Sequence, residues 1–222
     1  MKFTKGLVLV AMLSASLLVG CGKKGRTSNV KADYSTPEKT FATFVDAARA
    51  NDSVLVCECI SYNGKHKKLV NSAFEVVSSA VHLVDKIQKT YPEEVKKMLE
   101  KNAKPSQVPF RFEDIKASIQ ANIGADKKSA LLTSKYIPMI PLPMVKEGKE
   151  WKLKLPIKDK MIDTKSKAAE EMLPLVKNVL DNVAAKVGKK DETLNTLMAY
   201  AQLEFAKLKT KFEKIEKKHA KN

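Results

Sequence analysis

Two cysteines that stand one residue apart, Cys57 and Cys59, have the spacing closest to a chemical motif. With His66 they could chelate a metal ion, and by themselves they could form a tight redox disulfide. Metal sites need three or four ligands, and cysteines without such a set are more often small buried hydrophobic residues. We therefore interpret both cysteines as core residues and expect no metal site.

The histidines and the familiar catalytic patterns predict no active site. His82 falls on a predicted helix with apolar neighbours, which favours a hydrogen-bonded histidine at the edge of the core over a general base. His219 lies near the end of the chain. The sequence contains no His-Glu-x-x-His, Gly-x-Ser-x-Gly, phosphate-loop or dinucleotide-binding pattern. We therefore assign no catalytic residue and no cofactor-binding residue, and we expect no cofactor.

The third cysteine, Cys21, ends an N-terminal targeting pattern. Lys2 and Lys5 precede an uncharged apolar run over residues 7–20. This run is shorter than the roughly 20 residues of a membrane span and has the length of a signal-peptide core. Aliphatic residues, Gly20 and then Cys21 resemble the lipobox of bacterial lipoproteins. The resemblance implies that residues 1–20 are a lipoprotein signal peptide and that Cys21 is the lipidation site.

The same resemblance implies a place in the cell. Acyl chains such as palmitate on the cysteine would anchor the protein in the cell envelope. Gly22 follows the cysteine where an Asp would signal retention in the inner membrane, so the outer membrane facing the periplasm is expected. Residues 21–35 are polar and basic and predict a flexible tether. Its basic residues either contact anionic lipid or are simply solvated.

Composition limits the function classes. A chain of 222 residues with 44% hydrophobic residues can bury a core, which excludes a disordered or collagen-like protein. The formal net charge of +16 raises nucleic-acid binding, but aromatic residues make up only 6% and do not alternate with the basic runs. With an export signal as well, we expect no nucleic-acid partner.

Periodicity predicts helices first and strands afterwards. A helix is expected from Thr36-Pro37 to the break at Asn51-Asp52, and another over 69–84 that continues or restarts near Pro92. Apolar residues then alternate over 115–123, predicting a strand with one buried face. Further strands are expected over 129–134, 140–144 and 151–155. The prolines at 138, 141 and 143 favour an edge or bulged position for the third.

Two stretches carry a second resemblance. Residues 36–52 (TPEKTFATFVDAARAND) and 144–156 (MVKEGKEWKLKLP) resemble the first helix and last hairpin of nuclear transport factor 2-like domains. The resemblance implies an α+β domain over 36–157, with N-terminal helices packed on a curved antiparallel sheet that forms a cone. Some members of that superfamily are isomerases that use Asp and Tyr inside the cone. By residue type alone, Asp46, Tyr62 and Tyr136 are the nearest candidates, without a catalytic motif to support them.

Residues 160–222 form a helical C-terminal extension. A stripe from Met172 to Val187 predicts a helix that stops at Gly188, with Pro174 in its first turn or at a kink. Asp191 is expected to cap a second helix whose apolar seam runs from Leu194 to Ile215. We expect the two to form a helical hairpin or to pack on the sheet, in preference to pairing with another chain. The lysines that crowd the end contact anionic lipid or polyanions, or form a solvated face.

The sequence thus predicts a lipid-anchored cell-envelope protein. We expect a non-enzymatic module that binds an apolar small ligand or an envelope protein, besides the membrane to which its lipid attaches. The alternative is an envelope enzyme of the isomerase or hydrolase type that uses a pocket in the cone. That alternative predicts a deep pocket with a desolvated Asp or His beside a Tyr.

Overall fold

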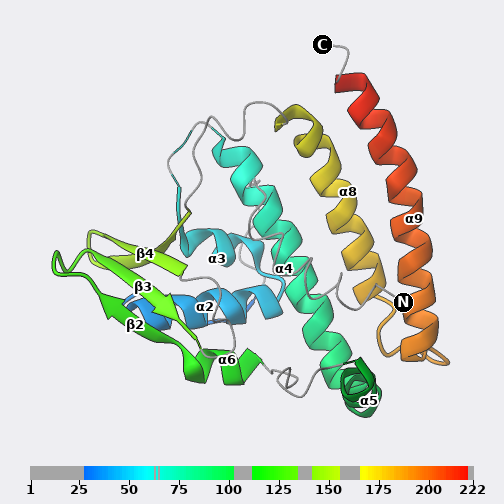
Figure 1. The fold of residues 1–222 in the computed structure, drawn as a ribbon, viewed down its shortest axis with the longest axis horizontal. Coiled ribbons are helices and arrows are strands. Elements are labelled where there is room, and N and C mark those ends of the chain that lie inside the picture. The colour runs from blue at the N-terminus through cyan, green and yellow to red at the C-terminus, as the bar shows by residue number, and fades with distance from the viewer. Residues whose placement is uncertain are drawn as a thin grey trace.

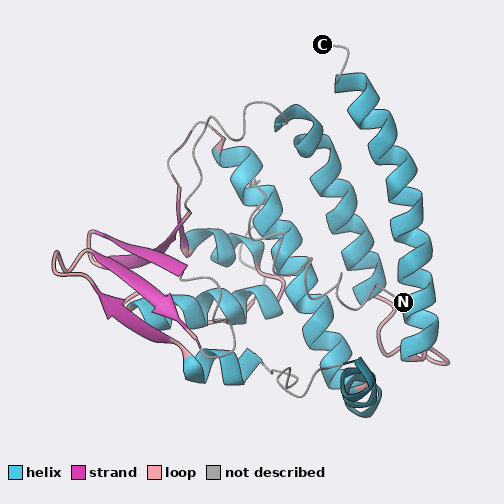
Figure 2. Cartoon of the chain, in the orientation of Figure 1, coloured by secondary structure: helices cyan, strands magenta, loops and turns pink. Residues whose placement is uncertain are grey.

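A computed structural model describes residues 28–62, 64, 66–102, 112–134, 142–155 and 166–219. The fold belongs to the α+β class, as the sequence predicts (Figures 1 and 2). A five-stranded sheet lies at one side of the molecule and the two C-terminal helices lie at the other, with the long helix α4 between them (Figure 1).

The first helix begins and ends where the sequence places it. α2 (Pro37–Arg49) has Thr36 as its N-cap, whose side chain accepts a hydrogen bond from the Lys39 amide. The chain turns at Asn51, which adopts a left-handed φ of 55°. Buried Asp52 then caps α3 (Ser53–Glu58) by accepting from the Leu55 amide at 3.1 Å.

Of the two alternatives expected near Pro92, a continued helix or a restart, the structure has the restart. α4 (Lys67–Thr90) ends at Tyr91, and α5 (Pro92–Asn102) follows at once. Pro in the first turn of α5 is compatible with a helix, because its missing amide would have no partner there. Two buried serines of α4, Ser78 and Ser79, donate to the Asn51 side chain, each at 3.3 Å. These contacts join α4 to the turn after α2.

The strand predicted over 115–123 is half wrong. Residues Phe112–Ser118 form helix α6, and only Gln120–Ile123 form strand β2. Ile115 and Ile119 are both buried. A separation of four residues satisfies a helical repeat as well as an alternating one, and Glu113 and Asp114 favour the start of a helix. The alternation of apolar residues therefore could not distinguish a helix from a strand at these positions.

The sheet is mixed, so the prediction of a purely antiparallel sheet is wrong. Its order is β1-β5-β4-β3-β2, in which β1 (Ile60–Ser61) runs parallel to β5 (Glu150–Lys154). β3 (Ser129–Thr133), β4 (Leu142–Glu147) and β5 pair antiparallel, as expected for consecutive hairpins. The β4–β5 turn is tight, with Gly148 at a left-handed φ of 61°.

Pro143 does not place β4 at an edge, because β4 lies between β3 and β5. The Lys146 amide donates to the Lys128 carbonyl across the β3 side at 2.8 Å. In an antiparallel ladder these positions alternate, so the nitrogen of Pro143 points away from β3. The register with β5 extends only from Met144 to Glu147. Pro143 therefore occupies a position where no ladder amide is needed.

Side chains fill the space between α2 and the sheet. The buried residues of this core come from α2, α6, the α6–β2 connection and three strands: Phe41, Val45, Ile115, Ile119, Ala130, Leu132, Met144, Trp151 and Leu153. The buried hydroxyl of Thr40 donates to the Trp151 carbonyl at 3.1 Å, which fixes α2 across β5. The interior of the predicted cone is a packed core among the residues described.

The C-terminal helices form a second core against α4. α8 (Ser166–Ala184) packs between α4 and α9 (Leu194–His219), so the predicted helical hairpin is present. The seam residues Leu194, Leu197 and Leu208 are buried in this core. Pro174 lies in the interior of α8, not in its first turn. Thr193, and not Asp191, caps α9, since the Thr196 amide donates to its hydroxyl at 3.2 Å.

The stretch predicted as a tether is docked from Ser28 onward. We call residues 28–35 the N-terminal strap. The Trp151 amide donates to the Tyr34 carbonyl at 2.9 Å, and the Asp33 amide donates to the Thr43 hydroxyl at 3.0 Å. Apolar strap residues Val30, Ala32 and Tyr34 pack on the core formed by α2 and α3. The prediction of a flexible tether therefore fails for this part, and residues 1–27 lie outside the described chain.

Candidate functional site

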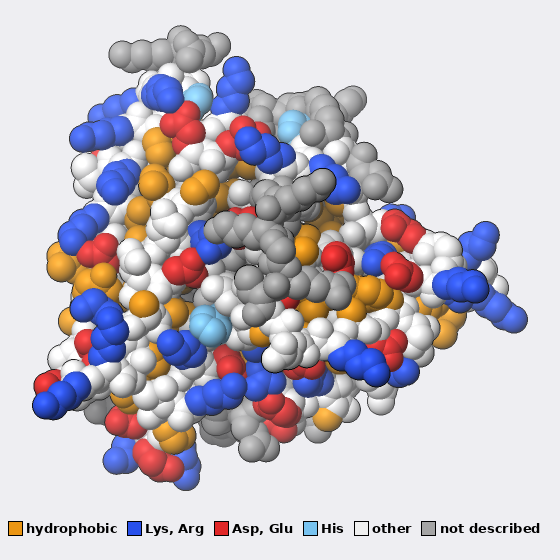
Figure 3. All heavy atoms as spheres, turned by 180° about the vertical axis from the view of Figure 1, so that it is seen from behind, with side chains coloured by type: hydrophobic (Ala, Val, Ile, Leu, Met, Phe, Trp, Pro, Cys, Tyr) orange, Lys and Arg blue, Asp and Glu red, His pale blue; other side chains and the backbone are white. Residues whose placement is uncertain are grey.

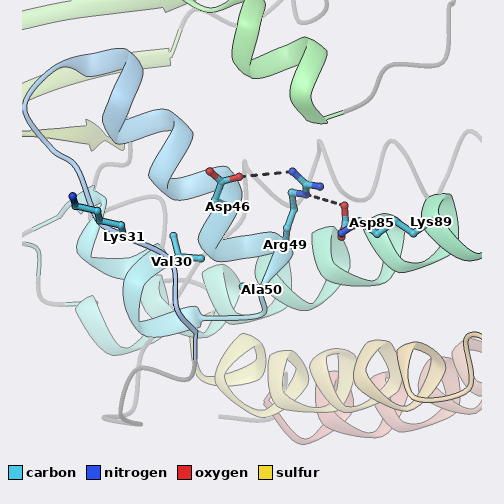
Figure 4. A pocket seen from close by; sticks show the side chains of 7 residues that line it. All are labelled: Val30, Lys31, Asp46, Arg49, Ala50, Asp85 and Lys89. Atoms are coloured by element: carbon cyan, nitrogen blue, oxygen red, sulfur yellow. Dashed lines mark hydrogen bonds and ion pairs between the residues drawn. The ribbon is translucent and has the colours of Figure 1, made fainter.

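A hollow of about 520 Å³ opens beside the N-terminal strap, where α2 crosses α4 (Figure 4). Its lining consists of Val30, Lys31, Asp46, Arg49, Ala50, Asp85 and Lys89. Arg49 is the centre of the charged side chains in this hollow. Its Nε donates to Asp85 Oδ1 at 2.8 Å, and its Nη1 pairs with Glu113 at 2.5 Å. Arg49 thereby ties α2 to both α4 and α6.

The charges in the hollow are balanced by one another. Asp85 is nearly buried, with 8% of its side chain exposed, and its second oxygen pairs with Lys89 at 2.7 Å. Asp46 pairs with Lys116 at 2.7 Å. The Arg49 guanidinium also lies 5.6 Å from the centre of the Phe112 ring. This arrangement holds three helices together and gives each described carboxylate that lines the hollow a basic partner.

The pKa directions agree with a structural role. Burial disfavours the charged guanidinium, but the hydrogen bonds and attraction of Asp85 and Glu113 outweigh it and raise the pKa of Arg49. A hydrogen bond from its own backbone amide, and then the pairing with Arg49, keep the pKa of Glu113 below its ordinary value. Both shifts favour the charged forms, as in a stabilising ion pair and unlike a poised general acid or base.

His82 is a hydrogen-bonded histidine at the edge of the core, as the sequence predicts. Its Nδ1 lies 2.6 Å from the Arg49 carbonyl, so this nitrogen carries the proton and donates to the end of α2. The bond gives the last turn of the helix a partner for an otherwise unsatisfied carbonyl. His82 therefore helps to hold α2 on α4.

Cys57 and Cys59 do not pair with each other. Cys59 is a buried thiol whose Sγ donates to the Leu55 carbonyl at 3.3 Å. Cys57 is disulfide-bonded, to a partner outside the described residues. The interpretation as a small buried hydrophobic residue is thus correct for Cys59 and wrong for Cys57. No group of three or more His, Cys, Asp and Glu side chains that could hold a metal occurs within the described ranges.

The candidate residues suggested by the isomerase resemblance are not brought together. Asp46 lies in the hollow and pairs with Lys116, whereas Tyr62 packs near Leu69 and Val70 in a different cluster. Tyr136 lies outside the described residues. The hollow is lined by no Tyr and no His among the residues described. Sequence reasoning did not single out Arg49, because its partners are 36 and 64 residues away and no local pattern connects them.

The surface carries much of the positive charge of the chain (Figure 3). Basic side chains are frequent near the end of α9, at the upper left of that view. Large exposed apolar side chains in the described regions are few and separate: Ile123, Leu131 and Leu203. Within these regions no helix has the length and hydropathy needed to cross a membrane.

Comparison with known proteins adds no relative. No protein-family model matches the chain, and neither a curated protein nor a solved structure is significantly similar to it.

Proposed function

We propose that this chain is a lipid-anchored protein of the bacterial cell envelope, held in the membrane by a diacylglyceryl thioether on Cys21. The observation that carries the proposal is the order of basic residues, apolar run, Gly20 and Cys21 at the N-terminus. Two or more acyl chains suffice for stable anchoring without a membrane-spanning helix. Gly22 stands where an Asp would signal retention in the inner membrane, which favours the outer membrane facing the periplasm.

The folded part serves as a non-enzymatic binding module with a nuclear transport factor 2-like cone. The antiparallel run from β2 to β5 and the position of α2 across the sheet are the features that support this relation. Because Leu132, Met144 and Trp151 with their neighbours fill the space between α2 and the sheet, a protein partner on the outer surface is favoured over an apolar ligand inside. The isomerase or hydrolase alternative needs a desolvated Asp or His beside a Tyr, and the described residues that line the hollow at Arg49 include no Tyr.

Metabolic labelling with palmitate tests the anchor. The wild-type chain and Cys57→Ala are expected to incorporate label, whereas Cys21→Ala is expected to incorporate none. Globomycin, which blocks the lipoprotein signal peptidase, should cause the uncleaved form to accumulate. Unchanged labelling of the Cys21→Ala variant would disprove the proposal.

The state of Cys57 provides an independent check. The chain has three cysteines, and a cysteine that carries a thioether cannot also form a disulfide. Cys59 is a thiol, so a disulfide at Cys57 and lipidation of Cys21 exclude each other within one chain. The lipidated protein should therefore show Cys57 as a thiol, alkylated by iodoacetamide under denaturing conditions without prior reduction. A mass that corresponds to a Cys21–Cys57 disulfide would refute lipidation.

A further inference from the structure

We propose that the outward face of the second half of α9 is a binding surface for anionic phospholipid. We call it the α9 lysine face. It consists of Lys207, Lys211, Lys214, Lys217 and Lys218, all exposed. The inference rests on the proposed anchor for its biological setting, but its test uses the protein without lipid.

Helical geometry places these lysines together. Residues 207, 211, 214 and 218 are spaced by four, three and four, so their side chains form one row about 17 Å long, with Lys217 beside it. The seam that packs on α8 and α4, where Leu197 and Leu208 are buried, lies about a third of a turn around the helix from this row. Leu203, 56% exposed, continues the row one turn before Lys207. The face thus combines several positive charges with an exposed leucine at one end.

Most of the charge on this face is available to a ligand. Lys207 pairs with Glu204 at 2.6 Å, and Lys218 pairs with Glu171 of α8 at 2.7 Å. The other three lysines form no ion pair within the described regions. Of the remaining acids of this half of α9, Glu216 falls on the other side of the helix from the row, whereas Glu213 lies one turn before Lys217 at the edge of the face. A row of exposed lysines that outnumbers the acids beside it suits the surface of an anionic bilayer.

The docked N-terminal strap keeps the folded domain close to the proposed anchor. Because the strap is held to α2, α3 and β5 from Ser28 onward, only residues 22–27 remain between it and the anchor at Cys21. Such a segment spans at most about 25 Å when fully extended. The domain therefore stays at the surface of the bilayer, where a basic helix face supplies a second attachment besides the acyl chains. This proximity favours a lipid surface over a soluble polyanion as the ligand.

Vesicle flotation tests the proposal with the unlipidated chain from Gly22 to Asn222, which contains every described element. The test variant is Lys211→Gln, Lys214→Gln and Lys217→Gln combined. A control with Lys67→Gln, Lys96→Gln and Lys97→Gln loses the same charge at exposed positions of α4 and α5. Glutamine has nearly the helix propensity of lysine, so both should fold, which circular dichroism verifies.

The wild type and the control should bind phosphatidylglycerol vesicles, with affinity that falls at high salt, and should not bind phosphatidylcholine vesicles. Each lysine near an anionic surface contributes roughly fivefold, so the test variant should bind about a hundredfold more weakly. Equal loss in both variants, equal binding to neutral vesicles, or retained binding by the test variant would overturn the proposal. So would loss of heparin binding with vesicle binding unchanged. Palmitate labelling of the full-length test variant reports on the anchor separately.

Discussion

Loss of the ion pair between Arg49 and Asp85 should lower the free energy of unfolding more than loss of an exposed ion pair. Asp85 has only 8% of its side chain exposed and Arg49 has 16%. Replacing Arg49 with Met leaves the carboxylate buried with Lys89 as its remaining partner. Removing one member of a buried pair costs about 3–5 kcal/mol, and the remaining pairing with Lys89 reduces this. We therefore expect Arg49→Met to lower the free energy of unfolding by about 2–4 kcal/mol.

Lys89→Met provides a control at the same carboxylate. Lys89 pairs with Asp85 at 2.7 Å but is 65% exposed, so its removal should cost no more than about 1 kcal/mol. Urea unfolding, followed by the fluorescence of buried Trp151, the single tryptophan of the chain, measures both variants. The double variant Arg49→Met with Asp85→Leu should lose less stability than the sum of the losses in the single variants Arg49→Met and Asp85→Leu. Equal effects of Arg49→Met and Lys89→Met would refute the inference that Arg49 is the main partner of the buried Asp85 carboxylate.

Further outcomes can be measured on the same chain. Hydrogen bonds from the Ser35 hydroxyl and amide, and then from Lys39, lower the pKa of Asp33 to about 2. A lowered folded pKa stabilises the protein above the unfolded value of 3.8 and loses that effect as the pH falls towards 2. The stability of wild type should therefore exceed that of Asp33→Asn at pH 7 and converge with it near pH 2, and a constant gap would contradict this. Leu132→Ala, at a fully buried position of β3, should lower the free energy of unfolding by about 2–5 kcal/mol in the same urea assay. Gly188 has a left-handed φ of 77°, so Gly188→Ala should cost about 1–2 kcal/mol, and no loss would show that the turn after α8 adapts.

Local signals in the sequence were sufficient for several elements. The Thr36-Pro37 cap, the turn at Gly148 and the seam from Leu194 to Leu208 each reside in a few neighbouring residues, and the structure contains all of them. Helix α6 was missed because the spacing of Ile115 and Ile119 fits both a helical repeat and the alternation of a strand. β1 was missed because two residues become a strand only through parallel pairing with β5, which lies far along the chain.

The N-terminal strap and the ion pairs of Arg49 show why other features could not be predicted from the sequence. The strap is polar in composition, so it resembles a linker, although Val30, Ala32 and Tyr34 alternate in the manner of a half-buried strand. The ion pairs of Arg49 join residues from three helices, and their formation depends on the angle at which α2 crosses α4. Such contacts follow from packing, and no spacing along the chain encodes them.

Helix α4 makes the C-terminal extension part of one cooperative structure. One face of α4 contributes Val76, Ala80 and Leu83 to the core shared with α8 and α9. Another face holds the turn after α2 through Ser78 and Ser79. Tyr91, directly after α4, accepts from the Gly188 amide at 3.2 Å and donates to the Glu192 carbonyl at 3.1 Å, which fixes the α8–α9 connection. Removing the extension would expose the apolar side of α4 to water, so we expect the C-terminal helices and the turn after α2 to unfold together.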